Sequence, residues 1–258
     1  MKANPVKKKL RDRGTAFGTM VFEFSTTGIA RIAAAAGAEF VIFDMEHTGW
    51  SIETIRTLLA TASGGDLVPM VRVPATEYHF LARVLDAGAR GVMVPMVESA
   101  EQARRIVQAT KYPPVGRRGA GFGMAHDDYQ PGDALAKMRS ANEETLLIAQ
   151  IETAAGVENV DAIAAVEGID VLWIGHNDLT NSMGIAMQFE HPRYREALGR
   201  VLAAGGKHNK ACGFMATDVE VGKSFLAQGF RILAFGGDIG IYQQGLRQGL
   251  AGLRGAMA

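Results

Sequence analysis

Short runs of apolar residues recur along the chain, and a longer segment with a helical pattern follows most of them. Two examples are "FVIFDM" at 40–45 and "LLIAQIE" at 146–152, whose continuous apolar character predicts strands of a parallel sheet covered on both faces. In the segments between such runs, for example "SIETIRTLLATA", apolar residues recur at i, i+3 and i+4, which predicts amphipathic helices. The eight predicted strands span residues 16–22, 40–45, 68–74, 91–97, 146–152, 171–175, 211–216 and 231–236.

Eight β–α units in a chain of 258 residues predict an α/β fold, a (β/α)8 TIM barrel, formed as a single domain over residues 1–258. A doubly wound sheet is the alternative, but the glycine-rich stretch "GAGFGMAH" follows a turn and lacks the G-x-G-x-x-G spacing of a dinucleotide site. The spacing is irregular at 112–145, where a Pro- and Gly-rich loop precedes a helix. We expect this loop on the active face, as a lid or an assembly element.

The charge and the cysteine content exclude several classes of partner and site. Lys plus Arg equals Asp plus Glu, at 27 each, so we expect neither a nucleic acid nor a membrane as partner. No apolar run reaches the ~18–20 residues of a membrane span, and the basic N-terminus lacks the apolar core of a secretory signal, which indicates a cytoplasmic protein. The basic cluster at 7–13 is expected to be a solvated tail. Cys212 is alone, which excludes an internal disulfide and a cysteine metal cage, and its apolar surroundings predict a buried thiol.

Chemically capable side chains gather at the carboxyl ends of the predicted strands, which a barrel brings together at one mouth. Each has a structural alternative: Arg72 and Glu152 can pair with each other, and Asp178 can cap the following helix. His176 is either a ligand or a surface residue. The residues of this set are Asp44, Glu46, His47, Arg72, Gln150, Glu152, His176, Asn177 and Asp178.

Two of these carboxylates predict a metal site. Glu152 and Asp178 follow adjacent strands, and converging carboxylates repel each other unless a cation lies between them. Oxygen ligands without a cysteine cage favour Mg²⁺, Mn²⁺ or Co²⁺. No lysine falls at the carboxyl end of a predicted strand, which disfavours a Schiff-base mechanism.

Several motifs, taken together, resemble the HpcH/HpaI aldolase family over roughly residues 14–250. The resemblance implies a class II, divalent-metal-dependent aldolase, which reversibly joins pyruvate, as its metal enolate, to an aldehyde and gives 4-hydroxy-2-oxo acids. An oxaloacetate decarboxylase and an acyl-CoA lyase, which would use the same site, are the alternatives. The motifs are "FDMEH", "VRVP", "LDAGARGVMVPMVESAEQA", "YPPVGRRGAG", "IAQIETAAGVEN" and "IGHNDLTNSMG".

The resemblance also implies roles for individual residues. Glu152 and Asp178 would be the metal ligands, and Arg72 and His47 would flank the bound 2-oxo acid. Asp86 in "VLDAG" matches an aspartate that serves the histidine in the family, often across a subunit contact.

From these roles we expect His47, oriented by Asp86 or Asp44, to transfer protons. Arg72 would face the charge that develops on the substrate. Backbone N–H groups around Asn177 and Asp178 would bind its carboxylate, and Gln150 completes the predicted substrate-binding set.

This sequence departs from the family pattern at one place, and the resemblance also implies how the chain assembles. The family often has Pro and then a small residue where this chain has His176 and Asn177, just before the predicted metal ligand. The last helix of the family packs on a neighbouring subunit, which implies a homo-oligomer, commonly a hexamer.

Overall fold

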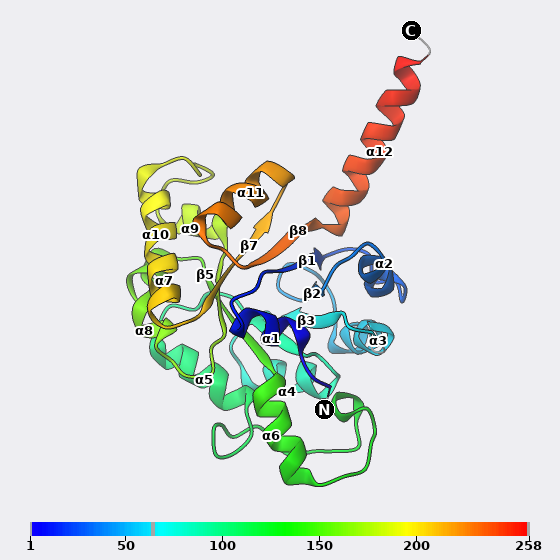
Figure 1. The fold of residues 1–258 in the computed structure, drawn as a ribbon, viewed down its shortest axis with the longest axis vertical. Coiled ribbons are helices and arrows are strands. Elements are labelled where there is room, and N and C mark those ends of the chain that lie inside the picture. The colour runs from blue at the N-terminus through cyan, green and yellow to red at the C-terminus, as the bar shows by residue number, and fades with distance from the viewer. Residues whose placement is uncertain (1, 63–64, 257–258) are drawn as a thin grey trace.

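The computed structural model describes residues 2–62 and 65–256, and its eight strands form a closed parallel barrel in sequence order (Figure 1). This confirms the predicted (β/α)8 fold, and every predicted strand is present with ends that differ by at most a few residues. The strands are β1 (Ala16–Val21), β2 (Phe40–Asp44), β3 (Val68–Arg72), β4 (Gly91–Val94), β5 (Leu146–Ile151), β6 (Val171–Ile174), β7 (Ala211–Ala216) and β8 (Ile232–Gly237).

Helices surround the barrel, and serine side chains cap the N-termini of two of them. The hydroxyl of Ser99 accepts a hydrogen bond from the Gln102 backbone N–H (3.1 Å), and the hydroxyl of Ser51 accepts from Thr54 N–H (3.2 Å). The helices are α1 (Pro5–Arg11), α2 (Ile29–Ala35), α3 (Ile52–Ala62), α4 (Tyr78–Asp86), α5 (Ala100–Thr110), α6 (Ala134–Glu144), α7 (Ala154–Glu158), α8 (Val160–Ala164), α9 (His176–Ser182), α10 (Pro192–Lys207), α11 (Val219–Gln228) and α12 (Asp238–Gly255).

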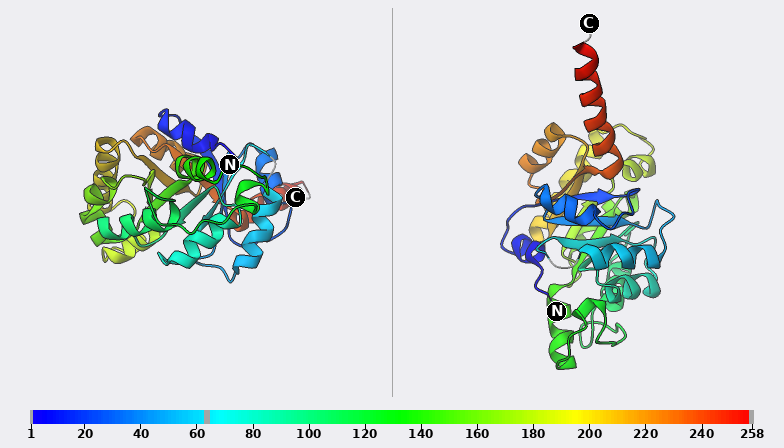
Figure 2. Two further views of the ribbon diagram at one scale, coloured as in Figure 1. Left: turned by 90° about the horizontal axis from the view of Figure 1, so that it is seen from below. Right: turned by 90° about the vertical axis from the view of Figure 1, so that its right-hand side faces the viewer.

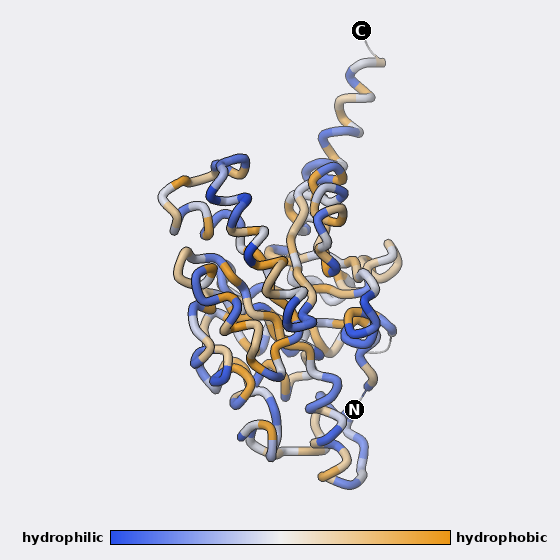
Figure 3. Tube along the Cα trace, turned by 60° about the vertical axis from the view of Figure 1, so that its left-hand side comes forward, coloured by the Kyte–Doolittle hydropathy of each residue, from blue (hydrophilic) through white to orange (hydrophobic). Residues whose placement is uncertain are grey.

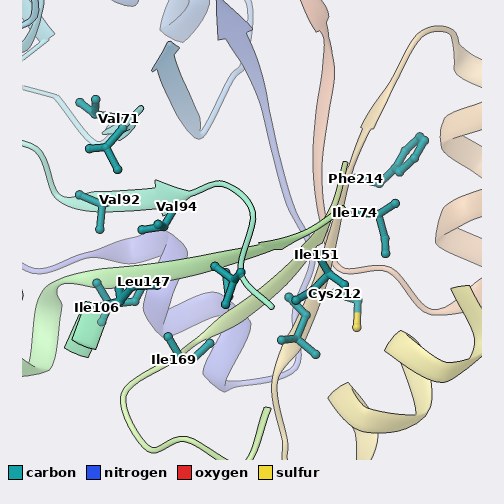
Figure 4. Close-up of a cluster of buried hydrophobic side chains, with 14 of the residues drawn as sticks. Val71, Val92, Val94, Ile106, Leu147, Ile151, Ile169, Ile174, Cys212 and Phe214 are labelled. Carbon is teal, nitrogen blue, oxygen red and sulfur yellow. The ribbon is translucent and has the colours of Figure 1, made fainter. Parts of the chain in front are cut away.

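The core has two layers, because successive residues of a strand face opposite sides of the barrel wall. Phe40, Ile42 and Trp173 belong to the cluster that fills the barrel. The outer layer, between strands and helices, includes Phe214 and Cys212, and Figure 4 shows part of it. Cys212 is buried, which confirms the predicted buried thiol, and this burial raises the pKa of the thiol to about 12.

The basic cluster at 7–13 is not a solvated tail, and that prediction was wrong. Most of it lies in α1, whose residues Val6 and Leu10 are buried in the inner core cluster. Lys7 pairs with Asp170 at 2.9 Å. The helix is therefore amphipathic: Lys8, Lys9 and Arg11 are exposed while two apolar residues pack against the inner core of the barrel.

The long segment between α5 and β5 lies at the end of the barrel opposite α12, near the N-terminus (Figures 1 and 2). Helix α5 returns the chain to the amino ends of the strands, so the segment that follows must begin on that face. The expectation that the loop in residues 112–145 lies on the active face, as a lid, was therefore wrong for a single chain. Arg118 of this segment is 3% exposed and pairs with Asp86 at 2.5 Å.

Helix α12 extends away from the barrel at the carboxyl ends of the strands (Figures 1 and 2). Apolar and polar residues alternate along it in Figure 3. On the barrel wall beside it, Phe17 of β1 and Phe235 of β8 are 46% and 40% exposed. In the described ranges no helix is long and apolar enough to cross a membrane. The exposed large apolar residues of α12 are Ile239, Ile241, Tyr242, Leu246, Leu250 and Leu253.

Candidate active site

Asp44, buried at the end of β2, holds two parts of the barrel mouth together. The register of β2 with β3 places Asp44 beside Arg72, and its Oδ1 accepts a hydrogen bond from the arginine Nε at 2.5 Å. Its Oδ2 accepts from the backbone N–H of His47 at 2.9 Å, and Oδ1 also accepts from Glu46 N–H. One carboxylate therefore fixes both the guanidinium and the turn that carries the histidine.

Glu46 is a second acidic partner of Arg72. Its Oε2 lies 3.1 Å from Arg72 Nη1. Burial raises the pKa of the Glu46 carboxyl, while the arginine opposes that shift. The other terminal nitrogen of Arg72, Nη2, makes no hydrogen bond in the described part of the chain, so a donor is left for a ligand.

His47 is not oriented by Asp44 through its ring. The aspartate accepts only from the histidine's backbone N–H, and the ring Nε2 lies 3.7 Å from Glu46 Oε2. The His47 side chain is 56% exposed at the mouth. Asp86 ends α4 at the other end of the barrel, bonded to Arg118, so one chain does not bring Asp86 and His47 together.

Glu152 follows β5 and lies in a closely packed setting. Its carboxylate accepts hydrogen bonds from the Gln150 side-chain amide and from the Met96 backbone N–H, the latter at 2.6 Å. Burial raises the pKa of Glu152 to about 7 despite these bonds, and the charges of Glu46 and Asp178 raise it further. Carboxylates that follow β2, β5 and β6 therefore act on one another at one mouth, as the sequence predicted for two of them.

Asp178 does not cap α9. Gly175 occupies the capping position without a side-chain bond, and Asp178 lies in the first helical turn. The neighbouring backbone passes close to Glu152: a Cβ on Gly175 would lie 2.6 Å from the Glu152 Cβ. Glycine at this position lets the two predicted metal ligands approach.

His176 and Asn177 do not join this cluster through their side chains. The His176 ring packs against Phe189 and Phe214, at centroid distances of 5.5 and 5.0 Å. Phe214 belongs to the outer core layer (Figure 4), and a cavity of about 580 Å³ lies beside it between α10 and α11. The side chain of Asn177 makes no hydrogen bond among the described residues. His176 is therefore a packing residue of the outer layer, and burial lowers its pKa.

Comparison with known proteins agrees with this geometry. The family described as HpcH/HpaI aldolase/citrate lyase matches residues 19–244. The chain belongs to this family. The 2-keto-3-deoxy-L-rhamnonate aldolase of Klebsiella pneumoniae is 36% identical over 253 residues, which are 96% of this chain and 92% of that protein. The hydroxypyruvate/pyruvate aldolase of Roseobacter denitrificans is 34% identical over 243 residues, 92% and 91% of the two chains.

A solved structure of an HpcH/HpaI aldolase from Desulfitobacterium hafniense has the same fold. It superimposes with a TM-score of 0.91 at 33% identity, covering 96% of each chain. Aldolase relatives that align over most of this HpcH/HpaI member support a carbon–carbon lyase activity.

HpcH/HpaI proteins are generally divalent-metal-dependent, and the donor set of this mouth fits such an ion. Gln150 Oε1 is buried without a hydrogen-bond partner, and the charges of Glu46 and Asp178 raise the pKa of Glu152, so the positive charge of Arg72 does not neutralise all the acids of the mouth. Within residues 2–62 and 65–256, no three His, Cys, Asp or Glu side chains are grouped closely enough to hold an ion. Hard cations that keep water and substrate as ligands need only one or two carboxylates.

Proposed function

We propose that this protein is a divalent-metal-dependent class II aldolase, which reversibly adds pyruvate to an aldehyde and cleaves 4-hydroxy-2-oxo acids. The observation that carries the proposal is the mouth itself, where the charges of Glu46 and Asp178 act on Glu152 and an arginine is held by Asp44 and Glu46. The names of the two aligned aldolases, which refer to 2-oxo acids, agree with it. We also propose that residues 1–258 act as one barrel domain.

Glu152 and Asp178 would hold Mg²⁺, Mn²⁺ or Co²⁺, with Gln150 fixing the Glu152 carboxylate through its amide. When bound, the ion would supply Lewis-acid polarisation of the substrate ketone. Backbone N–H groups of Asn177 and Asp178, in the first turn of α9, would bind the substrate carboxylate.

Arg72 and His47 would perform the steps that belong to the protein. Arg72 is held by Asp44 and Glu46 and would donate its remaining N–H groups to the oxygen on which negative charge develops. His47 is exposed at the mouth, where it would take a proton from the substrate and return it. Since Asp86 lies at the far end of the same chain, its predicted service to His47 requires the Asp86 of a second copy.

The alternatives differ in what the structure offers them. An acyl-CoA lyase would need basic residues at the mouth for the CoA phosphates, and the sequence offers the pair Arg117 and Arg118, but Arg118 is buried against Asp86 on the opposite face. That position disfavours the lyase. Oxaloacetate decarboxylation needs the same groups as the aldol reaction, so the structure does not separate the two activities. The assay below distinguishes them.

Helix α12 supports a homo-oligomeric assembly, for which the resemblance implies a hexamer. It carries a row of exposed apolar residues away from the barrel. Because α12 does not cover the barrel wall, Phe17 and Phe235 on that wall are exposed. Exposed apolar surfaces of this kind are typical of interfaces between chains. The partner we propose for α12 is a second copy of this protein.

The test is pyruvate release from a panel of 4-hydroxy-2-oxo acids, and from oxaloacetate, by EDTA-treated protein with Mn²⁺, Mg²⁺ or Co²⁺ restored. We expect metal-dependent release from at least one hydroxy-oxo acid. Release from oxaloacetate alone would instead establish the decarboxylase.

Two variants test the assigned roles. His47→Ala should lower the rate by about 10²–10⁴-fold, the usual contribution of one proton-transfer group, while Mn²⁺ still binds. Glu152→Ala should lose both activity and Mn²⁺ binding. Turnover like that of the wild type in either variant would contradict its role.

A further inference from the structure

Asp238, the first residue of α12, binds the segment that follows β1 and not its own helix. Its side chain is 7% exposed. Oδ1 accepts a hydrogen bond from Phe22 N–H at 2.9 Å, and Oδ2 accepts from Glu23 N–H at 2.9 Å and Phe24 N–H at 2.6 Å. Hydrogen bonds to an ionised acceptor are the strong ones, and three of them fix this backbone.

The clamped segment places an aromatic ring between the start of α12 and the active-site arginine. The Phe22 ring lies so close to Gly237 that a Cβ there would approach it to 2.6 Å, so the ring cannot move toward β8. The Arg72 Cζ lies 5.8 Å from the centroid of the same ring, within the range of a cation–π contact.

A second contact from α12 braces the same segment. Tyr242, one turn along the helix, meets the Phe24 ring edge to face at 5.7 Å. The base of α12 therefore holds both aromatic residues of the segment, through a carboxylate and through a ring.

Arg72 depends on this ring for part of its environment. Its side chain is 8% exposed and two carboxylates hold its Nε and Nη1. The Phe22 ring covers another side. If the ring moves, water enters beside the guanidinium and weakens its attraction for charge that develops on the substrate.

We propose that Asp238 is a positioning residue for the active site, acting through the Phe22 ring on Arg72. The proposal rests on the proposed function in one respect, namely that Arg72 faces the reacting substrate. It adds that the helix we assign to assembly also sets the geometry of the catalytic mouth.

The test compares Asp238→Asn with Phe22→Leu, which leaves the backbone clamp in place and removes only the ring. In both variants we expect kcat/KM for aldol cleavage to fall roughly 10- to 100-fold, the cost of a displacement of up to ~1 Å. The Kd for Mn²⁺ should stay within about twofold of the wild-type value, since neither Asp238 nor Phe22 touches the proposed metal ligands Glu152 and Asp178. Because both act through one ring, the double variant should be no worse than the poorer single variant.

The matched control is Asp218→Asn. Asp218 also lies at the start of a helix at the carboxyl end of a strand, but its carboxylate caps its own helix at Val221 N–H (2.9 Å). This variant makes the same acid-to-amide change at a helix start, where Asn still caps the helix, and it leaves the segment after β1 undisturbed, so its kcat/KM should equal that of the wild type.

A second readout needs no turnover. The Nε–H resonance of Arg72, assigned by its loss in Arg72→Lys, should shift in Asp238→Asn and in Phe22→Leu, and should stay in place in Asp218→Asn. If the wild type lacks aldolase activity, a shifted resonance still supports the positioning role while the proposed function fails. An unchanged resonance in Phe22→Leu overturns the inference even if Asp238→Asn does not fold.

Discussion

Gly175→Ala gives a sharp test of the metal site, because one added methyl group would meet the predicted ligand directly. Gly175 precedes α9 with φ −92°, a value that alanine adopts without strain, so the backbone does not oppose the change. The new Cβ would lie 2.6 Å from the Glu152 Cβ and 2.9 Å from the Gln150 amide nitrogen. The first of these is the root of the side chain, which cannot rotate out of the way.

The size of the effect follows from these distances. Carbon atoms in contact lie about 3.5–4.0 Å apart, so Glu152 or the backbone that carries it must shift by about 1 Å. Metal–ligand distances tolerate only about 0.2 Å, and a misplacement of ~1 Å at a reacting centre can cost about 10²-fold in rate. We therefore expect Mn²⁺ affinity and aldol turnover to fall together, by about 10²-fold or more.

Calorimetric titration with Mn²⁺ and steady-state pyruvate release measure the two quantities. Gly199→Ala is the control: this exposed glycine lies inside α10, and an added Cβ would meet nothing within 4 Å, so the change should leave both quantities alone. It should also stabilise the fold by about 0.5–1 kcal/mol. Wild-type Mn²⁺ affinity in Gly175→Ala would refute the placement of Glu152 at the ion.

Three further predictions concern other parts of the molecule. Arg72→Lys keeps the charge but loses the planar fork, so kcat/KM should drop at least tenfold with Mn²⁺ binding intact; full activity would make Arg72 structural. Burial lowers the pKa of Lys111 to about 7, so between pH 7 and about 10 the unfolded chain binds more protons and stability rises with pH. The free energy of unfolding of the wild type, measured by urea titration relative to Lys111→Met, should therefore climb across that window by up to about 1.4 kcal/mol per pH unit, and parallel curves would contradict it. Leu246→Asp on α12 should reduce the oligomer mass measured by light scattering, and an unchanged mass would remove α12 from the interface.

The barrel was predictable because its signal is local. Each strand is a continuous apolar run such as "FVIFDM", which only a sheet covered on both faces accommodates, and the helical periodicity lies between the runs. The carboxyl ends of parallel strands meet, so the convergence of Glu152 and Asp178 followed from their positions alone. The buried Cys212 followed in the same way from its apolar neighbours.

Other features depended on contacts between distant segments. Residues 112–145 are rich in turn-forming residues, but their place at the far end of the barrel follows from the direction of α5. The cluster at 7–13 looked like a tail because its lysines obscure the apolar positions Val6 and Leu10, which matter only once the barrel offers them a core.

The sequence by itself determined the strands, their order and the acidic character of the mouth, because these depend on residue type and spacing along the chain. Only the tertiary structure decided which acids hold Arg72, why His176 packs outward, and how Asp238 reaches the end of β1. These pairings join residues that are far apart in sequence, and their partners are fixed by strand register and by the direction of each side chain. A pattern of apolar and polar positions indicates whether a segment is a helix or a strand, but it does not indicate which residues of neighbouring elements lie side by side.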